Sequence, residues 1–152
     1  MVIDLSEVPI SQGTGYPEAF KSAVAGRSRQ RVGNAIGLTN FGVNLTKLAP
    51  GAQSALRHWH THQDEFIYII SGELILVTDA GETLLIPGMM AGFPAGVSNG
   101  HHLINRTNTI STYLEIGDRT SGDRAEYPEH DLLALPKIEG GHYFVHQDGQ
   151  PY

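Results

Sequence analysis

Turn-forming residues interrupt this chain so often that no long helix fits between them. Glycine occurs 18 times and proline 8 times in 152 residues, and no window has the apolar spacing of an amphipathic helix. Short runs of the β type stand between the turns instead. They cover residues 41–49, 65–70, 73–78, 83–86, 101–107 and 112–117. Short strands at this spacing predict an all-β sandwich or barrel.

The length and the apolar content suit one compact core. A chain of 152 residues with 40% hydrophobic residues can bury a single core comfortably, but two cores only poorly. We therefore expect one domain over residues 1–152, with the barrel in about residues 35–117. An irregular N-terminal arm with room for one strand precedes the barrel. A tail follows it, and aromatic side chains such as Tyr143 and Phe144 let this tail pack back onto the barrel.

Composition and charge exclude several classes of protein. The chain has no cysteine, which excludes disulfides, thiolate metal sites and cysteine nucleophiles. Its net charge is −6, with 16 acidic and 10 basic residues, so neither a nucleic acid nor an anionic membrane is an expected partner. The sequence lacks the features of a signal peptide and any apolar run long enough for a membrane span. We therefore expect a cytoplasmic protein.

One basic cluster stands apart from this acidic balance. Arg27, Arg29 and Arg31 occupy alternate positions in the segment AGRSRQRVG. They are either a solvated arm or a small patch that binds an anion, and three charges suit one phosphate better than a nucleic-acid backbone.

The segment RHWHTHQDEF, residues 57–66, carries three histidines at alternate positions and then two carboxylates. Residues two apart on a strand face the same side at a separation of about 6.5–7 Å, so His58 and His60 can converge on one ion. Glu65, at the start of the next predicted strand, can swing back beside them. His62 lies too far from His58 for one ion to take all three rings. Two imidazoles and one carboxylate suit a divalent transition metal ion, although the same pattern also fits the polar face of a strand.

A second candidate follows the turn PAG, where His101 and His102 begin a predicted strand. Adjacent residues on a strand point to opposite faces, so only one of these two rings can look into the barrel. Asn105 shares the parity of His101, which favours His101. A β-bulge in the preceding turn would exchange the two roles.

These motifs resemble the two conserved motifs of the cupin superfamily. The first is the stretch Gly51–x6–His58–x–His60–x4–Glu65–x6–Gly72, with one residue more than usual between its glycine and its first histidine. The second is the stretch Gly88–x5–Pro94–x–Gly96, leading into His101–x3–Asn105. Asn99 stands at the usual place of the second motif's histidine, which indicates a turn two residues longer than usual. The resemblance extends over roughly residues 35–117.

The resemblance to small bacterial single-domain cupins implies a double-stranded β-helix, or jelly-roll, barrel that holds one divalent transition metal ion (Zn, Mn, Fe or Ni). It implies His58, His60, Glu65 and His101 as the ligands, with His102 as the second choice for the fourth. Such barrels often form homodimers through their N-terminal strands. Some relatives of this kind are labelled sugar-phosphate isomerases.

Three functions agree with such a site. The first is a metal-dependent isomerase of a sugar or sugar phosphate, whose phosphate only the three arginines could hold. The second is an iron-dependent oxygenase of a small dioxo or phenolic compound, and the third is a non-catalytic module that binds a small molecule. The catalytic residues stay unassigned, because strand parity alone does not fix which polar side chains face inward. The candidates are Asn44, Thr46, Gln53, Tyr68, Tyr113 and Glu115.

Overall fold

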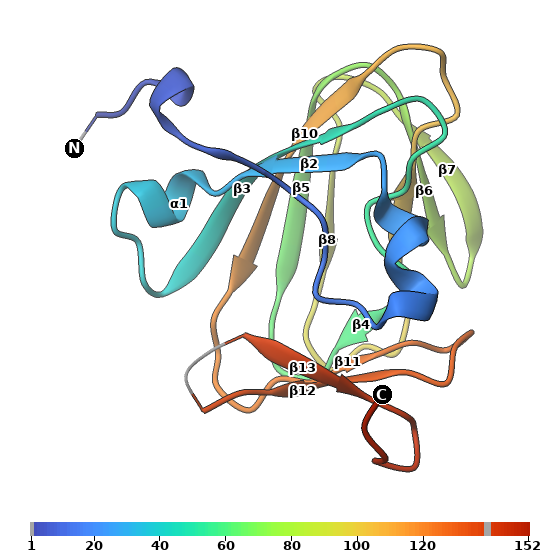
Figure 1. The fold of residues 1–152 in the computed structure, drawn as a ribbon. Coiled ribbons are helices and arrows are strands. Elements are labelled where there is room, and N and C mark those ends of the chain that lie inside the picture. The colour runs from blue at the N-terminus through green and yellow to red at the C-terminus, as the bar shows by residue number, and fades with distance from the viewer. Residues whose placement is uncertain (1, 139–140) are drawn as a thin grey trace.

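The computed structural model describes residues 2–138 and 141–152, and strands dominate it (Figure 1). The largest sheet has six strands in the order β1 (Ile10–Gln12), β2 (Arg27–Gln30), β3 (Phe41–Leu48), β10 (Ser111–Asp118), β5 (Glu65–Ser71) and β8 (Met90–Phe93). A three-stranded sheet has the order β7 (Gly81–Leu85), β6 (Leu74–Thr78) and β9 (His102–Ile104). All the strand pairs that join neighbours in these two sheets are antiparallel. The predicted all-β jelly-roll fold is confirmed.

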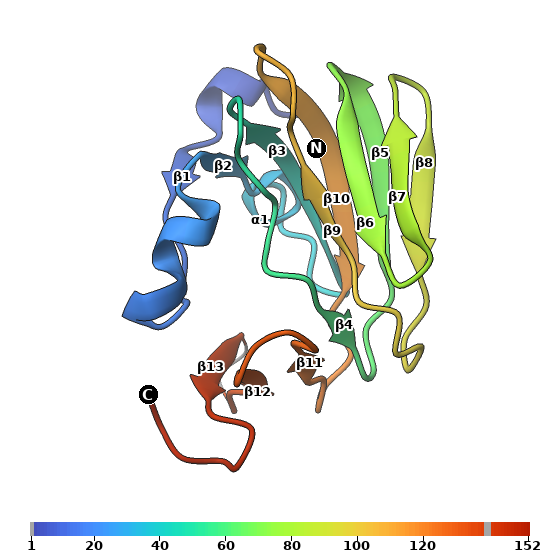
Figure 2. The same cartoon turned by 90° about the vertical axis from the view of Figure 1, so that its right-hand side faces the viewer.

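A third sheet lies at one end of the barrel (Figures 1 and 2). Its four strands follow the order β13 (His142–Val145), β12 (Leu133–Pro136), β11 (Ala125–Glu126) and β4 (Trp59–His60). The helices are short: two 3-10 helices at Leu5–Glu7 and Glu18–Val24, and one α-helical turn, α1, at Val32–Ala35. Within the described residues, none of them has the length and apolar character that a membrane crossing requires.

Two apolar clusters hold these sheets together. The first fills the barrel, and Leu48, Ile69, Leu74 and Tyr113 are nearly or fully buried in it. The second joins the tail to the N-terminal arm, with the contributors Tyr16, Val24, Leu56, Tyr127 and Leu132. The predicted packing of the tail is thus achieved through the arm and Leu56.

The N-terminal arm contributes two strands rather than one. Strand β2 pairs with β3 from Arg27↔Leu48 to Gln30↔Leu45, and β1 pairs with the outer edge of β2. The sequence RSRQ of β2 has no apolar alternation, so no pattern marked it as a strand. Pairing with β3 puts Arg27 and Arg29 on one face of the sheet. The predicted homodimer stays a prediction.

The strand register decides which polar side chains face the barrel interior, because directly paired residues project on the same face of a sheet. Tyr113 pairs with Thr46 and Ile69, and Ile69 is fully buried. Glu115 pairs with Asn44 and Ile67, and Ile67 is 5% exposed. Asn44, Thr46, Tyr113 and Glu115 therefore face inward. Of the other candidates, Tyr68 is on the outer face and Gln53 lies outside the named strands, in an isolated bridge to Ile104.

Gly72, the last residue of the first motif, closes the turn between β5 and β6. Its φ is 75°, and a Cβ atom there would lie 2.5 Å from Ser111 Oγ and 2.8 Å from Ser111 Cα. The backbone of β10 thus passes so close to the turn that only glycine fits.

Candidate metal centre

Three ligand groups of the first motif converge at one end of the barrel. His60 lies on β4, His58 just before it, and Glu65 begins β5. Glu65 Oε2 is 3.8 Å from His58 Nε2 and 3.7 Å from His60 Nε2, and the ligand atoms of all three residues lie within 4.8 Å of one another. Donors that share one ion at about 2.1 Å lie roughly 3–3.5 Å apart. The three ligand atoms could therefore bind one metal ion after moving slightly closer together.

His58 is held with its Nε2 atom toward Glu65. Its Nδ1 atom is 2.8 Å from the carbonyl oxygen of Leu56, so the ring donates there and leaves the Nε2 lone pair directed to the cluster. Burial lowers the pKa of His58 to about 3. The imidazole is thus neutral, which is the form that binds a metal ion.

His60 is oriented by a residue far away in the sequence. Its Nδ1 atom lies 2.6 Å from Oδ2 of Asp123, whose side chain is only 1% exposed. Burial acts to lower the pKa of His60, but the hydrogen bond to Asp123 and the charge of Glu65 raise it overall. Asp123 also accepts hydrogen bonds from the backbone N–H groups of His62 and Gln63. A carboxylate, a histidine and a ligand position in a row are the usual arrangement around protein-bound metal ions.

Glu65 is half-buried among groups that carry positive charge or donate hydrogen bonds to it. Burial acts to raise its pKa, but the hydrogen bond from His101 and the neighbouring rings of His60 and His58 hold the pKa well below its usual range. The carboxylate is therefore ionised. Two imidazoles with fixed tautomers and one carboxylate are a donor set that fits a divalent transition metal ion.

The structure separates the two histidines of the second motif. His101 Nε2 is 2.8 Å from Glu65 Oε2, and the His101 ring stacks on Phe93 with 3.5 Å between ring centroids. The backbone of His101 forms a bridge to His58. His102 turns the other way, with its Nδ1 atom 3.2 Å from the carbonyl oxygen of Ala55. His101 is thus the one that adjoins the cluster.

Asn105 and His62 do not join the cluster. Asn105 is fully buried, and its side chain holds the loop after β9 through hydrogen bonds to Leu48, Thr107 and Thr109. His62 is exposed in the turn between β4 and β5, where its ring contacts the hydroxyl of Thr61.

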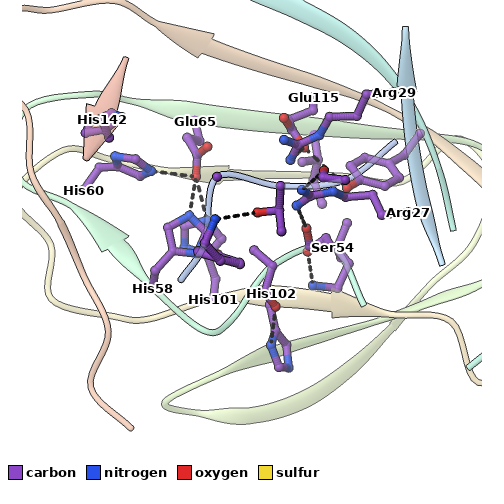
Figure 3. Close-up of a pocket in the computed structure, with 18 of the residues that line it drawn as sticks. Arg27, Arg29, Ser54, His58, His60, Glu65, His101, His102, Glu115 and His142 are labelled. Carbon is purple, nitrogen blue, oxygen red and sulfur yellow. Dashed lines mark hydrogen bonds and ion pairs between the residues drawn. The ribbon is translucent and has the colours of Figure 1, made fainter. Parts of the chain in front are cut away.

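The cluster opens into a cavity of about 460 Å³ whose lining also includes Arg27 and Arg29 (Figure 3). Arg31 is part of the same lining. Arg27 is buried and donates to the carbonyl oxygens of Ser54 and Gly13. Arg29 donates to Glu115. The basic cluster of the arm therefore lines the same cavity as the ligand group.

Sequence reasoning missed Asp123 and Phe93. Asp123 is one of 16 acidic residues and is 63 positions from His60. Its only local signal is a turn at Gly122, which has a φ of 81°. Phe93 ends the strand that pairs with β5, where Phe93 is opposite Glu65. Only the strand pairing puts this ring beside His101.

Comparison with known proteins agrees with this architecture. The cupin domain model matches residues 44–117. The crystal structure of a sugar phosphate isomerase of the cupin superfamily from Silicibacter pomeroyi is 43% identical to this chain. That match covers 100% of this chain and 96% of the other, with a TM-score of 0.95. The chain belongs to the cupin superfamily.

Other matches show how widely this cupin's fold is used. A protein provisionally named a sugar phosphate isomerase, from Acidithiobacillus ferrooxidans, is 26% identical over 83% of this cupin and 80% of its own chain, with a TM-score of 0.73. A polyketide cyclase from Streptomyces resistomycificus shares the fold at 16% identity over 78% of each chain, with a TM-score of 0.64. Among curated proteins, no sequence matches this cupin significantly.

Proposed function

We propose that this cupin is a metal-dependent isomerase of a sugar phosphate. One observation carries the proposal: a single cavity is lined both by the histidine–glutamate cluster and by three arginines. The full-length similarity to a protein named a sugar phosphate isomerase supports it. A cavity of about 460 Å³ is within the usual range for small-molecule sites, roughly 300–1,000 Å³.

In this proposal His58, His60, Glu65 and His101 hold one divalent transition metal ion. Such an ion, when bound, would polarise the oxygens of a neighbouring carbonyl and hydroxyl group. Leu56 and Asp123 keep the two imidazoles of the first motif in the tautomer that leaves Nε2 available. Phe93 covers one face of the His101 ring and limits its rotation.

The arginines make this part of the cavity positively charged, and Arg29 is the one that we expect to bind the phosphate directly. The net charge of the chain is −6, so the three guanidinium groups form a local positive region in a protein that is negatively charged as a whole. Guanidinium groups bind phosphate oxygens through paired, charge-assisted hydrogen bonds. This favours a phosphorylated substrate over the dioxo or phenolic substrate of an iron oxygenase.

The test is proton exchange in D₂O, followed by NMR. Protein purified without added metal is first analysed for its metal content and then incubated with aldose and ketose phosphates and with the same sugars without phosphate. We expect one metal ion per chain, and exchange of the proton on the carbon beside the carbonyl for the phosphorylated sugars alone.

Two results would contradict the proposal. Bound iron with oxygen uptake on a phenolic or dioxo compound would favour the oxygenase. Tight binding of a sugar phosphate without any exchange or turnover would favour the non-catalytic module.

A further inference from the structure

Arg29 and Glu115 form an ion pair inside the barrel, and neither residue is one of the proposed metal ligands. Arg29 Nη2 is 3.0 Å from Glu115 Oε2, and the two side chains are 26% and 17% exposed. Both residues line the cavity of the metal cluster and also a second cavity of about 460 Å³. The pair therefore lies between two spaces, and Figure 3 shows both side chains on the other side of Glu65 from His60.

The guanidinium of Arg29 has unused hydrogen-bonding capacity. Its Nε atom is buried and has no partner among the described residues. Arg27, two positions earlier on the same face of β2, donates instead to two backbone carbonyl oxygens, which fixes its guanidinium. A buried N–H without an acceptor is rare, and this one is available to an oxygen of another group. The Nε–Nη edge is the edge that takes two oxygens of one phosphate.

Glu115 is a diagonal neighbour of Glu65 in the large sheet and does not belong to the ligand cluster. Gly117 pairs with Glu65, and Glu115 is two residues earlier on the same strand and faces the same interior. Such diagonal neighbours on one face are about 7–8 Å apart. Asn44 Nδ2 and the Tyr113 hydroxyl also donate to Glu115, at 3.1 and 3.4 Å. These two donors hold its orientation even if Arg29 moves away.

We propose that Arg29 exchanges partners when substrate binds: it leaves Glu115 for the substrate phosphate, and Glu115 then moves the proton of the isomerisation. The proton transfer by Glu115 rests on the proposed function, whereas the movement of Arg29 from Glu115 to a phosphate does not. A phosphate dianion competes well with one carboxylate for a guanidinium, since it offers three oxygens and more charge. Loss of an adjacent cation makes a carboxylate a better proton acceptor in general.

The proton balance of the proposed step is closed. The Glu115 carboxylate takes the proton from C2 of the open-chain aldose, and the electron pair of that C–H bond forms the C1–C2 double bond of an enediolate. The hydroxyl on C2 gives its proton to the oxygen on C1 as the C2 carbonyl forms. Glu115 returns its proton to C1, which gives the ketose and restores the carboxylate.

The first experiment measures binding of inorganic phosphate by calorimetry on the full-length protein as purified. We expect Arg29→Met to weaken binding about tenfold or more. We expect Glu115→Gln to strengthen binding by about three- to tenfold, because the competing carboxylate charge is gone. His60→Ala separates this site from phosphate bound to a metal ion, since it should leave binding at Arg29 within about twofold.

Matched controls come from an exposed pair of the same kind. Arg106 forms an ion pair with Glu82 on the surface, away from both cavities. Arg106→Met and Glu82→Gln remove the same charges and should each leave phosphate binding within about twofold. Thermal melts check that every variant is folded. Unchanged phosphate binding in Arg29→Met, or weakened binding in folded Glu115→Gln, would overturn the exchange of partners.

The second experiment measures exchange of the C2 proton in D₂O. Glu115→Gln should lower the exchange rate by about 10²–10⁴-fold, although it binds phosphate more tightly and keeps its metal content. Glu115→Asp should recover part of the rate. Wild-type exchange rates in Glu115→Gln would overturn Glu115 as the proton carrier. A wild-type protein that shows the phosphate pattern but exchanges no sugar proton would instead overturn the isomerase function and leave the partner exchange of Arg29 supported.

Discussion

The two ends of the cavity are built in different ways. At the metal end, three ligand groups come from residues 58–65, and the two imidazoles already have fixed partners in Leu56 and Asp123. At the arginine end, β2 reaches the cavity only because it pairs with β3, and Arg29 has a partner that another anion could replace. The three ligand groups of the first motif are locally encoded, and the contacts of their imidazoles are prearranged. The arginine end is assembled over long range and open to change.

The largest expected effect is a loss of metal affinity when one ligand of the metal end is removed. His60→Ala removes one of three converging donors, so we expect metal affinity to fall more than about 100-fold, measured by metal content after dialysis and by competition with a chelator. The barrel should stay folded, because its core is apolar and does not include His60. His62→Ala is the matched control in the adjacent turn and should change affinity less than about twofold. A large loss there would move the ligand pair to His60 and His62.

The second prediction concerns the fourth ligand. His101→Ala should lower metal affinity by about 100-fold, because its Nε2 atom adjoins Glu65. His102→Ala should lower it less than about threefold, because that ring contacts the carbonyl oxygen of Ala55 instead. Chelator competition on the two variants gives the ratio directly. If His102→Ala has the larger effect, the register of the strand is shifted in the metal-bound protein.

The spacing of residues was sufficient to predict that His58, His60 and Glu65 converge, because a strand and the start of the next one bring them together locally. Metal binding there stays a prediction. The fold class also followed from local patterns, since turn signals bound every barrel strand that has apolar alternation. Strand β2 has the polar sequence RSRQ, and no local pattern distinguishes it from a loop. Whether Arg29 lines a cavity or lies in solvent is decided by its pairing with Thr46, which the sequence does not reveal.

Asp123 is the long-range member of the metal end, and the third prediction tests how much it matters. Asp123→Asn keeps the size of the side chain but removes the charge that orients His60 Nδ1–H. We expect metal affinity to fall by about 10–100-fold, with the stoichiometry unchanged. Chelator competition measures this, and Asp131→Asn is the control, because Asp131 holds His146 on the surface in a similar contact. If the two variants lower metal affinity equally, the contact between Asp123 and His60 is not what determines metal binding.

The smallest expected effect on ligand binding comes from Arg27, and it separates the two arginines of β2. Arg27 donates to the carbonyl oxygens of Ser54 and Gly13, so its guanidinium ties the arm to the chain before β4. Arg27→Met fills a similar volume but leaves both carbonyl groups without that donor. We expect the free energy of unfolding to fall by about 1–3 kcal/mol, measured from urea denaturation.

Phosphate binding should change less than about threefold in Arg27→Met, against about tenfold or more in Arg29→Met. The contrast follows from the hydrogen bonds. The Arg27 guanidinium would lose two hydrogen bonds to carbonyl groups if it rotated toward a phosphate. Arg29 has a buried Nε without an acceptor among the described residues. Calorimetry on the two variants at one temperature decides between them. If both lose phosphate binding equally, the two arginines act as one fixed anion site, and the arginine end is as prearranged as the metal end.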